Sequence, residues 1–305
     1  MADKSSHAYL GIDLGGTAMK GSLVHTDGSI GAMHSMRTPI ELGRTGILQA
    51  LVELIAHMFE LSGEWNVTGI GIGSAGRIDT KSGTVLYATD NLPGWTGTEI
   101  AKEIEQRFPY PVVVDNDVNV AAVGECWIGA AVEEKSVAFM ALGTGVGGAL
   151  VVDGALIQGH QGGAGDLGHQ IINPGGMSCN CGQRGCLEQY ASGTALNRES
   201  RAIASDWDSR RLVEAYMQGD VRAQEVMKRF TAHLAVGLIN VQRMFDPDLI
   251  VLGGGLIEAR HSWWDSLLLA IAEHTSLNLR IEPALLGNRA GMIGAARLAM
   301  LAGKV

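Results

Sequence analysis

Apolar and polar positions in the opening segment follow the pattern of a strand meander. Residues 9–13 and 21–25 are apolar stretches of strand length, and the Asp27-Gly28 pair is typical of a two-residue hairpin turn. The segment AYLGIDLGGTAMKGSLVHTDGSIGAMHSMRT therefore predicts three strands, with the turn LGGT joining the first two.

A helix is predicted over residues 43–61, where apolar side chains recur at helical spacing. Its apolar stripe consists of Ile47, Leu48, Leu51, Leu54, Ile55 and Met58. Strand-like segments follow at residues 67–75 and 111–117, and a helix is predicted from 118 to 127. This alternation predicts an α/β layer architecture.

The second half of the chain repeats the opening pattern. Residues 136–157, SVAFMALGTGVGGALVVDGALI, match YLGIDLGGTAMKGSLVHTDGSI in order and nearly in spacing, which indicates a duplicated strand-hairpin unit. Further elements are predicted as helices near 223–245, 263–275 and 291–301, with a strand and glycine turn at 249–255. We predict two lobes: a smaller one of residues 1–117, completed by the C-terminal helix in 291–305, and a larger one of residues 118–290.

Composition narrows the classes of function. The 305 residues carry a net charge of −9, which argues against nucleic-acid or anionic-membrane partners, because both need a basic surface. No segment has the length of a membrane span or of a signal peptide's apolar core. We therefore expect a cytoplasmic protein, in which clustered cysteines are metal ligands or catalytic groups more often than disulfides.

The 42 glycines gather at the ends of apolar, strand-like segments, where backbone can approach a ligand closely. Two turns, DLGGT and LGTGVGG, could each be a tight hairpin or a phosphate-binding turn whose N–H groups face an anion. The third, in LIVLGGGL, is either an ordinary strand-to-helix turn or a floor for a nucleotide base and ribose. The candidate nucleotide-binding residues are Asp13, Gly15, Gly16, Thr17 and Lys20, then Gly143, Thr144 and Gly145, and finally Gly253, Gly254 and Gly255. An aspartate beside triphosphate makes sense only if Mg²⁺ or its water shell lies between them.

The segment VVVDNDVNV places Asp115, Asn116 and Asp117 at the carboxyl end of a predicted strand. Open α/β sheets bind ligands at this edge, and a carboxylate there can accept the proton of an attacking hydroxyl. The alternative is that Asp117 only caps the following helix.

Three of the four cysteines lie within eight residues, in GMSCNCGQRGC. Cys179, Cys181 and Cys186 could provide three thiolates of a tetrahedral structural zinc site, and His169 is the nearest candidate for the fourth ligand. The alternative is a loop with three unpaired cysteines. The remaining cysteine, Cys126, reads as a small buried apolar residue.

Together these residues resemble the ROK family of repressors, open-reading-frame proteins and sugar kinases. GDLGHQ and CNCGQRGCLE are similar to the family's E-x-G-H and C-x-C-G-x-x-G-C-x-E motifs, and DLGGT, DND and LGTGVGG match in order and position. The resemblance implies an actin-like, ribonuclease-H-like fold of two lobes with ATP in the cleft. It also implies an ATP-dependent kinase that phosphorylates a sugar 6-hydroxyl, and a homodimer.

The resemblance assigns roles to individual residues. Asp117 would be the catalytic base, and His169 and the three cysteines would hold the zinc. The sugar would contact Gly76, Arg77, Thr89, Asn116, Asp117, Asp166, His169 and Glu188. The zinc loop would direct Glu188 towards the sugar.

The sequence departs from the family pattern at Asp166, where the family has a sugar-binding glutamate. The segment GSAGRID also looks closer to members of the N-acetylmannosamine kinase type than to strict glucokinases. An N-acetylmannosamine or N-acetylglucosamine kinase is therefore the alternative to a glucose kinase. A sugar-sensing ROK transcriptional regulator is disfavoured, because such members carry a DNA-binding segment before the first phosphate turn and here only twelve residues precede Asp13.

Overall fold

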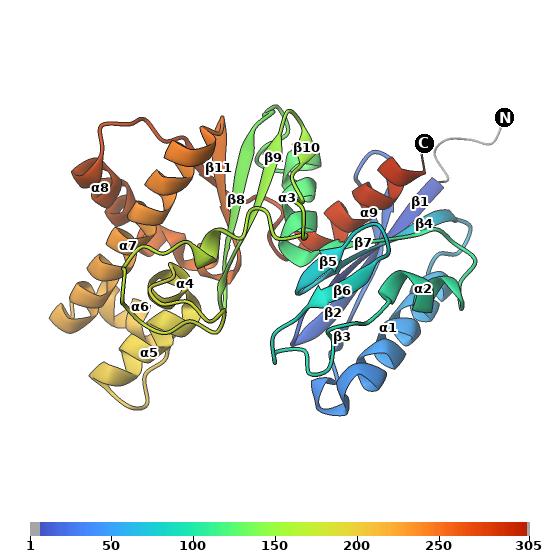
Figure 1. Ribbon diagram of the computed structural model, residues 1–305, viewed down its shortest axis with the longest axis horizontal. Helices are drawn as coiled ribbons and strands as arrows, with labels where there is room; N and C mark the ends of the chain where they lie inside the picture. The colour runs from blue at the N-terminus through green and yellow to red at the C-terminus, as the bar shows by residue number, and fades with distance from the viewer. Residues whose placement is uncertain (1–6, 304–305) are drawn as a thin grey trace. The chain divides into compact units, whose positions relative to one another are not determined.

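The computed structural model describes residues 7–303, and its chain divides into two compact units (Figure 1). Unit 1 takes in the chain up to Glu133, the segment Leu156–Ala164 and the chain from Leu285 onwards. Unit 2 consists of Glu134–Ala155 and Gly165–Ala284. None of the described helices is long and apolar enough to cross a membrane.

Unit 1 is built on a five-stranded sheet of order β3-β2-β1-β4-β7. The first three strands form antiparallel pairs, and β4 and β7 continue the sheet in parallel to β1. The strands are β1 (His7–Leu14), β2 (Ala18–His25), β3 (Ile30–Arg37), β4 (Asn66–Ser74) and β7 (Val112–Asn116), with a small hairpin of β5 (Arg77–Asp79) and β6 (Thr84–Tyr87). The helices are α1 (Gly43–Glu60), α2 (Ile100–Glu105), α3 (Asp117–Ile128) and α9 (Ala290–Ala302), with short 3₁₀ turns at Ile40–Leu42 and Gly287–Arg289.

The two faces of this sheet are covered by different helices. Leu10 and Ile12 of β1 join the apolar core formed with α1 and α2, whereas Gly11, which points the other way, lies against the backbone of α9. A side chain at Gly11 or Gly71 would collide with the carbonyl oxygens of Met292 or Ala295 in α9. Glycine in β1 and β4 therefore lets α9 pack directly onto the sheet.

Unit 2 repeats this topology with a sheet of order β10-β9-β8-β11-β12. Its strands are β8 (Val137–Leu142), β9 (Val146–Val152), β10 (Ala155–Leu156), β11 (Leu249–Gly253) and β12 (Ile281–Pro283). Its helices are α4 (Glu188–Ala191), α5 (Gly193–Ile203), α6 (Ser209–Met217), α7 (Val221–Phe245) and α8 (Trp264–His274), with 3₁₀ segments η3 (Leu167–His169) and η4 (Gly255–Ser262). Residues of α5 to α8 share one apolar core with alternate residues of β8, β9 and β11. In both units a hairpin is extended by two parallel strands, so the duplicated unit predicted from the sequence is confirmed.

The boundary between the units differs from the predicted one after Asp117. Helix α3 belongs to unit 1, because its backbone packs closely against α9: a side chain at Gly124 would lie 2.6 Å from the carbonyl oxygen of Ala290. The segment Leu156–Ala164 also belongs to unit 1, although the predicted larger lobe included it. The glycine turn after β11 leads into a 3₁₀ segment, η4, and the helix predicted near 263–275 is confirmed as α8.

A fully buried carboxylate holds two segments of unit 1 together. Glu125 of α3 accepts hydrogen bonds from the backbone N–H groups of Ala130 (2.8 Å), Leu285 (3.1 Å) and Leu286 (2.8 Å). Ala130 lies shortly before the chain leaves unit 1, and Leu285 is where it returns. Backbone donors thus satisfy a polar group that would otherwise be costly to bury.

Candidate active site

The junction between β7 and α3 holds the predicted catalytic residue. The side chain of Asn116 caps α3: its Oδ1 accepts hydrogen bonds from the N–H groups of Val118 (2.9 Å) and Asn119 (3.1 Å). Its Nδ2 donates to Asp117 Oδ1 and to the carbonyl oxygen of Gly76, both at 2.9 Å. The N-cap is therefore Asn116 and not Asp117, the residue considered for that role in the sequence, and the capping amide also orients the carboxylate of Asp117.

Asp117 titrates at an unusually high pH for a carboxylic acid. Burial, together with the negative charge of Asp13, raises its pKa from 3.8 to about 6, against the opposing effect of hydrogen bonds from Val118 and Asn116. Burial also raises the pKa of Asp13, and the opposite charge of Lys20 lowers it. Asp13 and Lys20 are direct cross-strand partners in the β1–β2 pair. A carboxylate with a pKa near 6 is suited to accept a proton at neutral pH.

The first glycine turn joins β1 to β2 and is held by short backbone contacts. Gly15 donates its N–H to the carbonyl oxygen of Ala18 (3.1 Å), and the hydroxyl of Thr38 donates to the carbonyl oxygen of Gly15 (2.6 Å). At the start of α9, a side chain on Gly291 would approach the Asp13 carboxyl carbon to 2.8 Å. The turn that carries Asp13 is therefore adjacent to the first turn of α9 within unit 1.

Three predicted sugar-binding residues lie around the β5–β6 hairpin. Gly76, in a left-handed conformation with φ 109°, accepts the hydrogen bond from Asn116. Arg77 begins β5 and pairs with Tyr87, and Thr89 follows two residues after Tyr87. The structure thus places Gly76 in direct contact with Asn116.

In unit 2 the structure brings together two of the predicted glycine turns. Gly254 has φ 85°, and a side chain there would clash with the backbone of Leu142, immediately before Gly143. By contrast, a Cβ atom at Gly143 or Gly255 would meet no other atom within 4 Å. No described protein atom therefore crowds these two positions, and the space beside them is open to a ligand.

The N-terminus of α5 supports the turn between β8 and β9. Gly193 and Thr194 donate their N–H groups to the carbonyl oxygens of Gly143 (2.8 Å) and Thr144 (3.2 Å). Neither residue was predicted to support this turn, although the Ser192-Gly193-Thr194 segment has the composition of a helix start.

Glu188 lies between the cysteine loop and the same glycine turn. Its Oε2 accepts a hydrogen bond from Val146 N–H at 3.0 Å, and its Oε1 lies 4.0 Å from the sulfur of Cys179. A side chain at Gly145 would collide with this carboxylate. The predicted sugar-binding glutamate is therefore in direct contact with a predicted nucleotide turn.

His169, Cys179, Cys181 and Cys186 form a compact cluster whose potential ligand atoms all lie within 4.8 Å of one another. The Sγ atoms of Cys181 and Cys186 are 3.6 Å apart, and the Sγ of Cys179 is 3.5 Å from His169 Nδ1. A disulfide needs a sulfur–sulfur distance of about 2.05 Å. In a tetrahedral zinc site with Zn–S bonds of about 2.3 Å, sulfurs lie roughly 3.8 Å apart. The donor set and spacing of the cluster therefore fit a tetrahedral metal.

Asp166 and His169 belong to one short segment around η3. Asp166 Oδ1 lies 3.9 Å from His169 Nε2, the ring nitrogen remote from Cys179. In metal sites a carboxylate commonly accepts a hydrogen bond from the histidine ring nitrogen that does not bind the metal. The structure thus places Asp166, the residue that differs from the family pattern, next to the histidine of the cluster.

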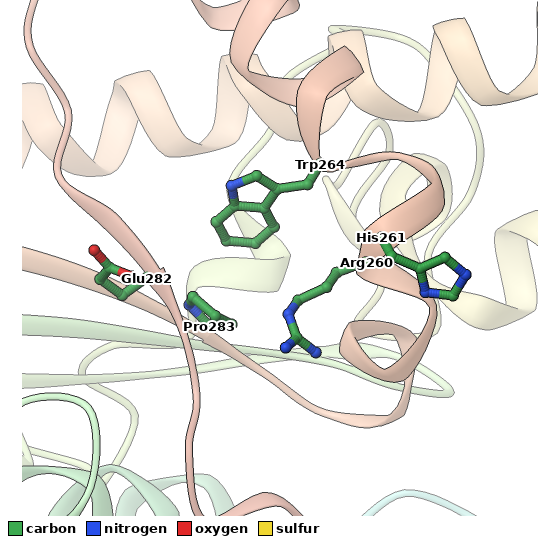
Figure 2. A pocket seen from close by; sticks show the side chains of 5 residues that line it. All are labelled: Arg260, His261, Trp264, Glu282 and Pro283. Atoms are coloured by element: carbon green, nitrogen blue, oxygen red, sulfur yellow. The ribbon is translucent and has the colours of Figure 1, made fainter.

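A pocket of about 340 Å³ opens elsewhere in unit 2, among residues of η4, α8 and β12. Figure 2 shows the indole ring of Trp264 above the guanidinium group of Arg260, with Glu282 and Pro283 on the strand opposite. Its lining consists of Arg260, His261, Trp264, Glu282 and Pro283, and includes none of the residues that the sequence singled out.

The chain is similar to known proteins along nearly its whole length. The profile of the ROK family matches residues 9–301. An N-acetyl-D-glucosamine kinase from Salmonella paratyphi B is 32% identical over 309 residues, which cover 95% of this chain and 98% of that protein.

Two crystal structures agree with the whole fold. A ROK hexokinase from Thermus thermophilus, 32% identical, superposes with a TM-score of 0.87 and covers 97% of this chain and 99% of its own. A ROK family glucokinase from Streptomyces griseus in complex with glucose and AMPPNP, 31% identical, superposes with a TM-score of 0.84 and covers 96% and 99%. These likenesses confirm the predicted actin-like ATPase fold. The chain belongs to the ROK family.

Proposed function

We propose that this protein is an ATP-dependent sugar kinase that transfers the γ-phosphoryl group to the 6-hydroxyl of a hexose such as glucose. The observation that carries the proposal is Asp117, a carboxylate at the start of α3 whose pKa is raised to about 6. Its position at the carboxyl end of β7 is the edge at which open α/β sheets bind ligands. The named kinases among the relatives support the same activity.

In this mechanism Asp117 accepts the proton of the sugar 6-hydroxyl as that oxygen attacks the γ-phosphorus and ADP departs. The hydrogen bonds from Val118 N–H and Asn116 Nδ2 both reach Oδ1, so we assign the proton to Oδ2. The N–H groups and the amide hold the carboxylate in one orientation, which is the main contribution of protein groups to phosphoryl transfer.

Glycine turns are proposed to bind the nucleotide, and each unit contains candidates. In unit 1 the proposed nucleotide-binding residues are Gly15, Gly16 and Thr17, with Asp13 and Lys20. In unit 2 they are Gly143 to Gly145 and Gly253 to Gly255. Backbone N–H groups of glycine turns suit phosphate oxygens. Asp13 would act through Mg²⁺ or its water shell, because a bare carboxylate beside triphosphate is repulsive.

A zinc ion at His169, Cys179, Cys181 and Cys186 is part of the proposal, supported by the fit of these four groups to a tetrahedral site. When bound, it would supply structure and no chemistry, since a site with four protein ligands is closed. The loop also carries Glu188 in the following helix, so the metal would fix the direction of that carboxylate.

The second candidate is an N-acetylglucosamine or N-acetylmannosamine 6-kinase, and Asp166 is the observation that favours it. The family's glutamate reaches one methylene further, so the shorter carboxylate leaves more room beside the sugar. We assign sugar contacts to Gly76, Arg77, Thr89, Asn116, Asp166, His169 and Glu188.

A coupled assay with purified protein tests the proposal directly. Glucose, mannose, fructose, N-acetylglucosamine and N-acetylmannosamine are each offered with ATP, and then with polyphosphate. The proposal expects ATP-dependent phosphorylation of at least one of these sugars. Sugar binding without turnover by metal-loaded protein would instead favour a sugar-sensing regulator.

The same proposal includes a cytoplasmic location and a homodimer. Both rest on the resemblance to the family and on the composition. Light scattering coupled to gel filtration measures the mass in solution, and a mass of one chain would contradict the dimer.

A further inference from the structure

Asp115 is the residue of the Asp-Asn-Asp segment to which the proposed mechanism gives no role. Its side chain is 2% exposed, so it lies too deep to touch a substrate. Oδ1 accepts hydrogen bonds from its neighbour Asn116 N–H (2.7 Å) and from Asn119 Nδ2 in α3 (2.8 Å). This oxygen therefore joins the end of β7 to the first turn of α3, which carries Asp117.

The other oxygen of Asp115 holds a remote segment of the chain. Oδ2 accepts a hydrogen bond from Gln158 Nε2 at 2.8 Å, and Gln158 Oε1 accepts one from the hydroxyl of Thr80 at 2.9 Å. With both ends of its amide occupied, Gln158 has one orientation. Asp115, Gln158 and Thr80 form a continuous chain of hydrogen bonds inside unit 1.

Gln158 belongs to Leu156–Ala164, which we call the returning loop, because it lies in unit 1 while the chain on both sides of it lies in unit 2. Ala164 N–H closes the loop by donating to the Gln158 carbonyl oxygen at 3.2 Å. Gly162, with φ 64°, lies against the backbone of Ile78, and a Cβ at Gly163 would lie 3.2 Å from Arg77 Nε. The returning loop thus packs on the β5 strand, whose first residue is Arg77.

The chain leaves the returning loop at Gly165 and reaches Asp166 one residue later. His169 follows at the end of η3. A loop anchored two residues before Asp166 restricts the positions that Asp166 can take, because one residue spans at most about 3.6 Å.

We infer that Asp115 is a positioning residue that, through Gln158, anchors the returning loop to the strand end that carries Asp117. In this arrangement one buried carboxylate sets both the start of α3 and the loop that leads to Asp166. The kinetic part of this inference rests on the proposed sugar kinase activity. The structural part, anchorage of the loop, does not.

In the Asp115–Gln158 hydrogen bond the amide donates and the carboxylate accepts, so the roles of the two residues can be exchanged by mutation. In Gln158→Glu two carboxylates face each other without a donor between them, and like charges in a buried site repel. In the double variant Asp115→Asn with Gln158→Glu, the new amide donates to the new carboxylate. Thr80 still donates to residue 158, and the Asn Oδ1 still accepts from Asn116 and Asn119. Gln161→Glu, which adds the same charge at an exposed position of the same loop, is the matched control.

Two measurements are made on each variant: amide hydrogen exchange of residues 156–164 in the free protein, and KM for sugar and for ATP. We expect Gln158→Glu to exchange about tenfold faster in this loop, since local opening sets exchange rates. Its sugar KM should rise about tenfold, with the KM for ATP changed less than about twofold. The double variant should return both values to within about threefold of the parent, and Gln161→Glu should leave them unchanged.

Gln158→Met, which removes the donor without adding charge, should give the same faster exchange if Gln158→Glu proves too unstable to purify. Unchanged exchange in Gln158→Glu and Gln158→Met would overturn the anchorage. A folded double variant that exchanges as fast as Gln158→Glu would overturn it too. Faster exchange with an unchanged sugar KM overturns the link to the sugar side. If the parent phosphorylates no sugar, the proposed function fails, and the exchange measurements alone decide the anchorage.

Discussion

Glu188 Oε2 accepts a hydrogen bond from the backbone N–H of Val146 at 3.0 Å. Val146 is the first residue of β9, directly after the turn Gly143–Gly145, and Glu188 begins the helix that follows the cysteine loop. A residue expected to recognise sugar is therefore fastened to a turn expected to bind phosphate.

Removing this carboxylate should weaken the binding of both ATP and sugar. In Glu188→Ala, Val146 N–H loses its partner and the turn loses its support, so KM for ATP should rise about threefold to tenfold along with KM for sugar. Glu188→Gln keeps an acceptor oxygen for Val146 and should raise KM for sugar alone. Steady-state kinetics with each substrate varied in turn separates the two cases. Equal KM values for ATP in parent and Glu188→Ala would show that the hydrogen bond does not matter to the turn.

Asp117→Asn should keep the fold and sugar binding and lose most turnover. Asparagine retains an oxygen for Val118 and Asn116 but accepts no proton, and loss of a general base costs about 10²–10⁴ in kcat. Sugar affinity, measured by calorimetry, should stay within about threefold. Turnover within about threefold of the parent would remove Asp117 from the mechanism.

The same variant should be more stable than the parent above neutral pH. The folded-state pKa of Asp117, about 6, lies above its ordinary value of 3.8, so folding favours the protonated form. The stability that this carboxyl contributes is present below pH 3.8 and is lost as the pH rises through about 6. Asp117→Asn should therefore gain about 1–3 kcal/mol in free energy of unfolding at roughly pH 8 and gain nothing near pH 4. Urea unfolding at both pH values measures the difference.

The pH dependence of catalysis should show the raised pKa of Asp117, and this pKa should depend on the charge of Asp13. Because the base must be ionised, kcat/KM for sugar should fall with decreasing pH through an apparent pKa of about 6. Asp13→Asn removes a negative charge that raises this pKa, so the limb should move to lower pH. Residual activity of that variant, even if small, suffices for the profile. A limb at the same or a higher pH would contradict the electrostatic link.

Zinc should be found at one ion per chain by elemental analysis of protein purified without chelator. Cys181→Ser should lose the metal and raise KM for sugar about tenfold or more, because Glu188 follows the same loop. Cys126→Ser, a cysteine in α3 outside the cluster, should keep the full metal content. Metal-free parent protein would defeat the zinc assignment.

Asp166→Glu should shift preference towards glucose. The added methylene moves the carboxylate by about 1.5 Å, enough to convert a loose contact into a direct charge-assisted hydrogen bond. We expect the ratio of kcat/KM for glucose to that for N-acetylglucosamine to rise about tenfold, equivalent to about 1.4 kcal/mol. A ratio that is unchanged, or that moves towards the acetylated sugar, would show that Asp166 does not govern this choice.

The strands and long helices could be predicted because their signals are local. Asp27-Gly28 marks a hairpin, and the stripe from Ile47 to Met58 marks α1 within one residue of its observed end. The unit boundary could not be predicted, because it depends on contacts between segments far apart in the chain. Gly11 and Gly71 admit α9 to the sheet, and glycine carries no hydropathy signal that would show this.

The candidate site shows the same division. Composition and spacing were enough to single out the four metal-ligand candidates, which the structure gathers into one cluster. The sequence pointed to Asp117 as the possible cap, but Asn is an equally good N-cap, and the backbone geometry shows that the cap is Asn116. Gln158 gave no signal at all, because its partner Asp115 lies 43 residues away in the sequence.

The packing of α9 onto β1 and β4 has a consequence for synthesis on the ribosome. The strands β1 and β4 come early in the described chain, but α9, the helix that packs on them, follows all the elements of unit 2. At roughly 5–20 residues per second, synthesis of the chain from β1 to α9 takes about 15–60 seconds. The stretch Gly165–Ala284, which provides most of unit 2, is contiguous and is complete before α9 emerges. The α9-facing side of β1 and β4 therefore stays uncovered by its helix until all of unit 2 has been synthesised.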